Sequence, residues 1–80
     1  MEKILIAEPD NLLANEVIRQ LKLAGYSRIL YAPNGEEALA VCRKEKPELL
    51  IINMSLPDYF GLELPEILAS KSEEYGKPFI

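Results

Sequence analysis

Short apolar runs alternate along the chain with segments whose apolar positions recur at helical spacing. Residues 4–7 and 49–52 are unbroken apolar runs of strand length, which is typical of strands covered on both faces of a sheet. Residues 28–32 indicate a second short strand between them, and residues 79–80 have the character of the first residues of a fourth. The pattern therefore predicts three strands and the beginning of another.

The first predicted helix covers residues 11–24, between the first two strands. Asp10 precedes it and can cap its N-terminus, because a short acidic side chain accepts hydrogen bonds from the free N–H groups of a first turn. Its apolar positions recur on one side of the helix, at Leu13, Val17, Leu21 and Ala24. We expect this stripe to lie against the sheet.

Two further helices follow along the chain. The second begins after Asn34, with Glu37 three residues later as its partner in a capping box, and Pro47 closes it. The third is expected over about 62–74, where Pro65 fits only within the first turn. Strands that alternate with helices through short connections predict an α/β fold, with a parallel sheet and right-handed crossovers.

Polar side chains follow two of the buried strands, and in such sheets ligands bind beyond the C-terminal ends of the strands. They are Glu8 and Asp10, on either side of Pro9, and Asn53. One interpretation is an acidic site for a divalent cation or a phosphoryl group, built across neighbouring strands. The other is that Glu8 ends a strand, Asp10 caps a helix and Asn53 forms a turn. The spacing alone leaves both interpretations open.

Composition narrows the choice of function. The chain has 80 residues and a mass of 9.0 kDa, which suits one small domain. Its net charge of −4 argues against a nucleic-acid-binding surface, and its lack of His excludes a Ser-His-Asp triad and a His-ligated metal. Cys42, the single cysteine, cannot form an internal disulfide and is expected to be an inert core residue. No apolar run is long enough to span a membrane, so we expect a cytoplasmic protein.

Five segments, in their order and spacing, resemble bacterial response-regulator receiver domains. They are KILI (3–6), AGY (24–26), APNGEEAL (32–39), KPELLII (46–52) and LPDYFGLEL (56–64). The resemblance covers essentially the whole chain and implies a flavodoxin-like three-layer α/β/α sandwich with strand order 2-1-3-4-5. It also implies a role in two-component (phosphorelay) signal transduction, with a histidine kinase, another signalling protein or an output domain as partner.

The chemistry that the resemblance implies is phosphoryl transfer from a histidine kinase to an aspartate that ends the third strand. Mg²⁺, held partly by an acidic pair after the first strand, would neutralise the phosphoryl oxygens. Here Asn53 stands at the aspartate's position, and Glu8 and Pro9 stand at those of the acidic pair. Asp10 could replace the lost carboxylate, and Ser55 matches the position whose backbone carbonyl contacts the metal. We therefore expect any Mg²⁺ binding by these residues to be weak, and a carboxamide should form no acyl phosphate.

Receivers of this kind have five strands and five helices, so residues 1–80 are expected to form the N-terminal part of one, ending inside the fourth strand. A deletion that joins the third helix to the fifth strand is the alternative, because residues 77–79 also resemble a segment that follows that strand. In either case the third strand would have an exposed edge beside apolar residues. We expect association through this edge, including a homo-oligomer.

Two functions are then in competition. A pseudo-receiver that acts through protein–protein contacts without Asp phosphorylation is favoured by the departures at both Asn53 and Pro9. The alternative is an ordinary phosphoaccepting receiver in which Asn53 is an engineered Asp-to-Asn block. A conventional enzyme on the same fold is not expected, because the chain lacks the nucleophile and a Gly-rich phosphate loop.

Overall fold

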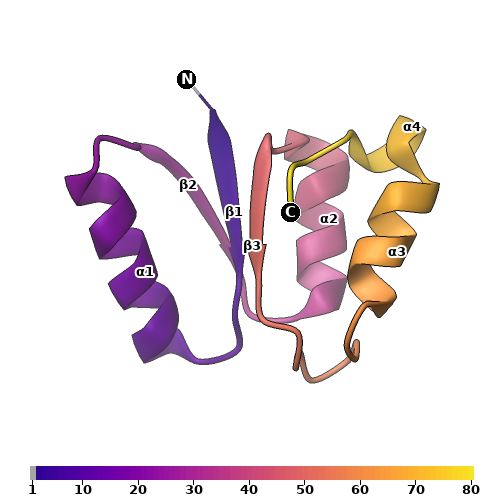
Figure 1. Ribbon diagram of the computed structural model, residues 1–80, viewed down its shortest axis with the longest axis horizontal. Helices are drawn as coiled ribbons and strands as arrows, with labels where there is room; N and C mark the ends of the chain where they lie inside the picture. Colours follow the sequence, from indigo (N-terminus) through magenta and orange to yellow (C-terminus); the bar gives the residue numbers. More distant parts are fainter. Residues whose placement is uncertain (1) are drawn as a thin grey trace.

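A parallel sheet forms the middle layer of the protein, whose computed structural model describes residues 2–80 (Figure 1). Within these residues the sheet has three strands in the order β2-β1-β3, which is the predicted order as far as the strands extend. The strands lie within one residue of the apolar runs that predict them. They are β1 (Lys3–Ala7), β2 (Arg28–Ala32) and β3 (Leu49–Ile52).

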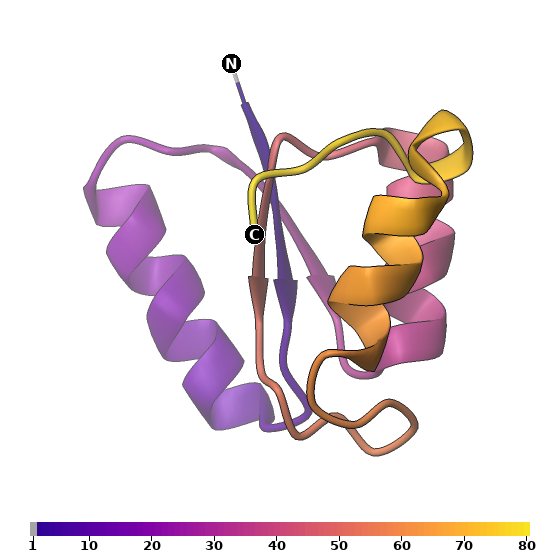
Figure 2. The ribbon, with the colours of Figure 1, turned by 45° about the vertical axis from the view of Figure 1, so that its right-hand side comes forward.

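Helices cover both faces of this sheet. α1 (Asn11–Leu23) lies on one face, whereas α2 (Gly35–Glu45), α3 (Glu63–Ser70) and α4 (Ser72–Tyr75) lie on the other, as Figures 1 and 2 show. This layering confirms the predicted flavodoxin-like α/β sandwich. None of the helices within residues 2–80 has the length and apolar character needed to cross a membrane.

β1 is the centre of the core because it is paired along both edges and covered on both faces. Residues 4–7 pair in parallel with β2 on one side and β3 on the other. Successive side chains of a strand point to opposite faces, so Ile4 and Ile6 pack with α1. Leu5 and Ala7 point the other way and belong to the core beneath α2, α3 and α4. An unbroken apolar run is what such a position requires.

The cap of α1 is confirmed. Asp10 Oδ1 accepts hydrogen bonds from the backbone N–H of Leu12 at 2.9 Å and of Leu13 at 3.3 Å. The helix ends at Leu23, and Gly25 follows it with φ of 102°, a left-handed conformation that a residue without Cβ adopts easily.

The predicted apolar stripe of α1 is partly wrong. The helix instead rests on Ala14, Val17, Ile18 and Leu21. Ala14 is 1% exposed, because its small side chain lets the helix approach the sheet closely, whereas Leu13 is 48% exposed. Leu13 instead lines a hollow between α1 and β3, together with Val17 and Ile51. None of the described residues fills this hollow. The spacing of apolar residues could not show which of two adjacent stripes would be centred on the sheet.

α2 begins at its predicted cap, with one difference in the box. Asn34 Oδ1 accepts from the N–H of Glu37 at 2.8 Å, but Glu37 Oε2 accepts in return from the Asn34 side-chain amide, at 3.4 Å, rather than from the backbone. At the other end, Lys46 has φ of 46° and its Nζ donates to the backbone oxygen of Glu74 at 2.8 Å. The end of α2 is therefore joined to α4.

The single third helix predicted over 62–74 is wrong, because the chain bends at Lys71 (φ −127°, ψ 49°) and divides into α3 and α4. The bend turns Tyr75 back onto α2, where it is 4% exposed. Its hydroxyl accepts from Arg43 at 3.1 Å, and the guanidinium lies 5.3 Å from the ring centroid. Pro65 is the third residue of α3, within the first turn as predicted.

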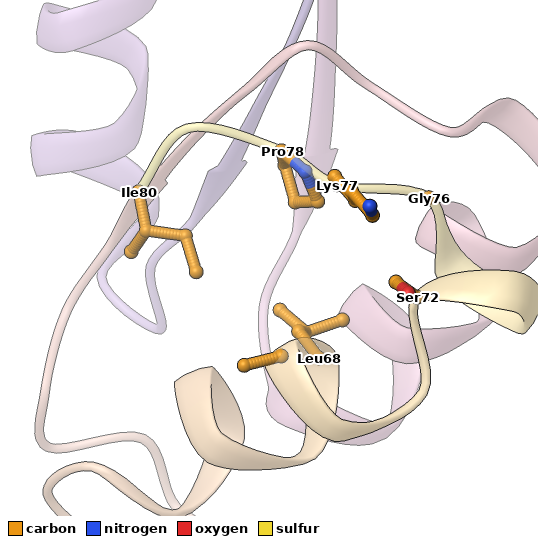
Figure 3. A pocket seen from close by; sticks show the side chains of 7 residues that line it. Leu68, Ser72, Gly76, Lys77, Pro78 and Ile80 are labelled. Carbon is orange, nitrogen blue, oxygen red and sulfur yellow. The ribbon is translucent and has the colours of Figure 1, made fainter.

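The last residues begin a further parallel pairing at the free edge of β3. Phe79 N donates to Glu48 O at 2.8 Å, and Leu50 N donates to Phe79 O at 2.8 Å. These residues therefore pair in parallel directly beside β3. Figure 3 shows the hollow between this segment and α3, lined by Leu68 and Ile80 among others.

β3 is less covered than its sequence predicts. Leu50 is buried, but Ile51 on the opposite face is 37% exposed. Apart from the bridge to Phe79, β3 is an edge strand among the residues described. The exposed edge that the sequence predicts for this strand is therefore present in residues 2–80. The expected cover on both faces is incomplete at Ile51, because apolar composition indicates the burial that a strand suits and not which elements are present to cover it.

Candidate functional site

The structure brings Glu8 and Asn53 together at the C-terminal edge of the sheet. The sheet itself holds their backbones, since Glu8 N donates to Ala32 O at 3.0 Å and Asn53 N donates to Ala7 O at 2.9 Å. The Asn53 side-chain Nδ2 then donates to both carboxylate oxygens of Glu8, at 3.0 Å to Oε1 and 3.2 Å to Oε2. Adjacent parallel strands end at the same edge, which is why residues 45 positions apart meet.

Both ends of the Asn53 amide are occupied. Its Oδ1 accepts from the backbone N–H of Ser55 at 2.8 Å, so the oxygen must face Ser55 and the NH₂ group must face Glu8. Glu8 is 8% exposed, and its Oε2 also accepts from the backbone N–H of Asp10 at 3.0 Å. The carboxylate is thus satisfied entirely by N–H groups of the chain.

The other predicted site residues do not join this pair through their side chains. Asp10 directs its carboxylate to the first turn of α1, as its role as a cap requires. Pro9 offers no side-chain donor or acceptor, and Ser55 contributes its backbone N–H to Asn53. Within residues 2–80, no three His, Cys, Asp or Glu side chains gather where they could hold a metal ion.

The residues at this site do not have the ligands for the divalent cation that the resemblance implies. A hard cation needs several oxygen ligands, commonly more than one of them charged. The pocket formed by Glu8 and Asn53 offers one carboxylate, and this carboxylate already accepts from the Asn53 NH₂ group and the Asp10 backbone N–H, both of which repel a cation.

Tyr31 contacts the backbone of Glu8 from the neighbouring strand. Its hydroxyl, at the end of β2, lies 2.8 Å from the backbone oxygen of Glu8 and 2.8 Å from Asn11 Oδ1. Burial raises the pKa of this phenol, and the negative charges of Glu8, Asp10 and Glu37 raise it further. A neutral hydroxyl therefore joins β2 to the turn between β1 and α1.

Asp58 has a role in the structure that the sequence did not indicate. Its Oδ1 accepts from Gly35 N at 2.8 Å and its Oδ2 from Glu36 N at 2.9 Å, so it caps α2 from a distant loop. Burial acts to raise the pKa of Asp58, but these backbone hydrogen bonds outweigh it and hold the pKa below its ordinary value. The Tyr59 ring lies directly against Gly35. The sequence indicates only that the first N–H groups of α2 need hydrogen-bond acceptors, and it does not show which residue supplies them.

Large apolar side chains are exposed around the same edge of the sheet. Leu12, at the start of α1, is 82% exposed, and Phe60 and Leu62 are 74% and 62% exposed. Met54, which follows Asn53 in the chain, is 40% exposed. We call these four residues the apolar rim. Exposed apolar groups at one edge of a domain are typical of protein–protein contact surfaces.

Comparison with known proteins places this geometry in a family. The family model described as "Response regulator receiver domain" matches residues 4–79. The chain is 33% identical over 72 residues to "Probable transcriptional regulator ycf27" of Pyropia yezoensis, and 30% identical over 69 residues to "Transcriptional regulatory protein PdtaR" of Mycobacterium tuberculosis. These matches cover 90% and 86% of this chain, but 29% and 34% of those relatives.

A shorter relative and a solved structure agree. "Polar-differentiation response regulator DivK" of Brucella anthropi is 32% identical over 80 residues, which is all of this chain and 65% of the relative. The crystal structure of the N-terminal domain of an uncharacterized protein from Wolinella succinogenes superposes with a TM-score of 0.77 at 26% identity, covering 96% of this chain and 59% of that one. The chain belongs to the response regulator receiver domain family, and it spans about a third of the length of most curated relatives described here.

Proposed function

We propose that this chain is a cytoplasmic pseudo-receiver of two-component signalling, which acts through contacts with a histidine kinase, another signalling protein or an output domain and is not phosphorylated. The observation that carries the proposal is the state of Asn53, whose amide stands where the family resemblance puts the phosphoaccepting aspartate. Its nitrogen lone pair is delocalised into the carbonyl, and both of its polar atoms are already hydrogen bonded. No free nucleophilic oxygen faces the pocket from this position.

The competing proposal is an ordinary receiver in which Asn53 is an engineered block. Pro9 supports the pseudo-receiver over this alternative, because a block needs one substitution, and the loss of a second acidic position is independent of it. The arrangement of Asp10 supports it too, since its carboxylate is committed to the cap of α1.

Phosphorylation by a small acyl phosphate distinguishes the two. The protein, its Asn53→Asp variant and an Asn15→Asp control on the exposed side of α1 would each be treated with acetyl phosphate and Mg²⁺ and weighed by intact mass spectrometry. We expect no phosphoryl adduct on the parent or the control, because neither presents a carboxylate in the pocket at position 53.

The outcome on the variants decides between the proposals. An adduct on the parent would refute the pseudo-receiver. An adduct on Asn53→Asp alone would show that the amide is the sole block and would favour the engineered alternative. No adduct on any of the three would mean that Pro9 and the altered acidic site also prevent the reaction, as the pseudo-receiver requires.

The apolar rim supports a protein partner as the way in which the module acts. Phe60 and Leu62 are more than half exposed, and they extend from the loop that Asp58 attaches to α2. A preordered loop loses little conformational entropy when a partner binds it. The loop that carries Phe60 and Leu62 is therefore ordered by its hydrogen bonds to α2, and it needs no phosphorylation to become so.

The exposed edge of β3 supports a second contact, with another copy of the chain. Ile51 is 37% exposed, Phe79 77% and Ile80 49%, so apolar surface lies beside the part of the β3 edge beyond the bridge to Phe79. We expect the protein to sediment as a dimer at high concentration, and Ile51→Lys to shift it toward monomer, since a lysine on an edge strand disfavours pairing. Leu23→Lys, at an exposed site on α1, should leave the dimer intact. A stable, cooperatively unfolding monomer at all concentrations would refute this contact.

A further inference from the structure

We propose that the Asn53 amide takes the place of a bound cation in this protein, so that the acidic pocket is complete without a metal ion. The inference rests on the proposed function, in which Asn53 carries no phosphate. It adds that the Asn53 amide keeps the Glu8 carboxylate ordered. The argument begins from Glu8, which is 8% exposed and is the only charged residue among the buried ones described.

A buried carboxylate is stable only when positive charge or hydrogen-bond donors compensate for its lost hydration. Both oxygens of Glu8 are compensated by N–H groups, two contacts coming from Asn53 Nδ2 and one from Asp10 N. None of the described residues forms an ion pair with it. The partial positive charge of the amide NH₂ group therefore lies where a cation would otherwise be needed.

The amide is also held in this orientation. Ser55 N donates to Asn53 Oδ1 at 2.8 Å, and a rotation that turned the amide oxygen toward Glu8 would lose this bond and bring two acceptors together. A cation could reach Glu8 only after the amide had left. The hydrogen bonds of the Asn53 amide to Glu8 and Ser55 therefore exclude a cation from the pocket. The pocket also lacks the ligands to bind one.

Substitution by aspartate reverses this logic. Asn53→Asp would replace the donor, which lies 3.0 Å and 3.2 Å from the Glu8 oxygens, by a second carboxylate of the same size. Two partly buried carboxylates at this separation repel each other, unless a cation lies between them. The variant should then be less stable than the parent and should regain stability when a divalent cation binds.

Thermal unfolding of the full chain, with EDTA or with millimolar Mg²⁺ and NaCl of matched ionic strength as the control, tests the inference. We expect the Tm of the parent to be the same in all of these solutions. For Asn53→Asp in EDTA we expect a Tm lower by about 4–8 °C, the usual effect of a modest destabilisation in a domain of this size. Mg²⁺ should restore most of this loss, and NaCl should not.

The double variant Glu8→Gln/Asn53→Asp is the matched control, because it exchanges the carboxylate and the amide across the same contact. We expect it to be more stable than Asn53→Asp in EDTA and to be indifferent to Mg²⁺. If Asn53→Asp does not fold even with Mg²⁺, this control decides the matter: folding of the double variant supports the inference, and its failure to fold refutes it.

Two results would overturn the inference directly. One is a parent whose Tm rises with Mg²⁺ as much as that of Asn53→Asp, and the other is an Asn53→Asp variant as stable as the parent in EDTA. These results are distinct from a failure of the proposed function, which would be recognised by a phosphoryl adduct on the parent protein and not by its melting.

Discussion

Leu5→Ala is expected to leave the domain largely unfolded at room temperature. Leu5 is 0% exposed and lies at the centre of β1, in the core that α2, α3 and α4 cover. Removal of a buried Leu side chain costs about 2–5 kcal/mol, since packing is lost and a cavity remains. A domain of this size has little stability to spare, because it buries a smaller share of its surface than a larger one. Circular dichroism during urea unfolding measures the change.

Leu12→Ala is the matched control for this experiment. It removes the same atoms from a side chain that is 82% exposed at the start of α1, and we expect a change within about 0.5 kcal/mol. Equal losses in the two variants would contradict the placement of β1 at the centre of the core. A Leu5→Ala variant with the stability of the parent would contradict it as well.

Gly35→Ala is expected to destabilise the domain by about 1–3 kcal/mol and to release the loop after β3. A Cβ at position 35 would overlap the ring of Tyr59, so the ring must move. Tyr59 follows Asp58, whose carboxylate holds the N–H groups of Gly35 and Glu36, and displacement of the ring therefore strains this cap. Urea unfolding gives the free energy, and hydrogen exchange of the two N–H groups shows whether the cap has opened.

The same substitution in a Tyr59→Ala background separates the overlap from other effects. Without the ring, the new methyl group has space, and alanine is a better helix former than glycine at the start of α2. We expect Gly35→Ala to be neutral or stabilising there. If it were equally harmful in both backgrounds, contact with Tyr59 would not be the cause.

The strands and helix starts could be predicted because each depends on nearby residues. Asp10 and Asn34 cap the helices that follow them, and the apolar runs predict β1 and β3 within one residue. The meeting of Glu8 with Asn53 could also be predicted, since it follows from the parallel order of neighbouring strands. Local chemistry and topology together were sufficient for these features.

What could not be predicted depends on distant packing. At the bend at Lys71 the chain turns so that Tyr75 contacts Arg43 on α2. The sequence of residues 62–74 does not indicate that contact. The capping of α2 by Asp58 joins residues 23 positions apart. The orientation of the Asn53 amide depends on Ser55 N and Glu8 at once. In each case the sequence shows a group that needs a partner, and only the fold supplies it.

The central place of β1 has a consequence for synthesis of the chain. β1 leaves the ribosome before both of its neighbours, and its contact with the start of β3 spans 45 residues. At translation rates of about 5–20 residues per second, this strand waits roughly 2–9 s with an unpaired edge and apolar side chains in water. Nascent chains should therefore be prone to aggregate, and dependent on chaperones, during this interval.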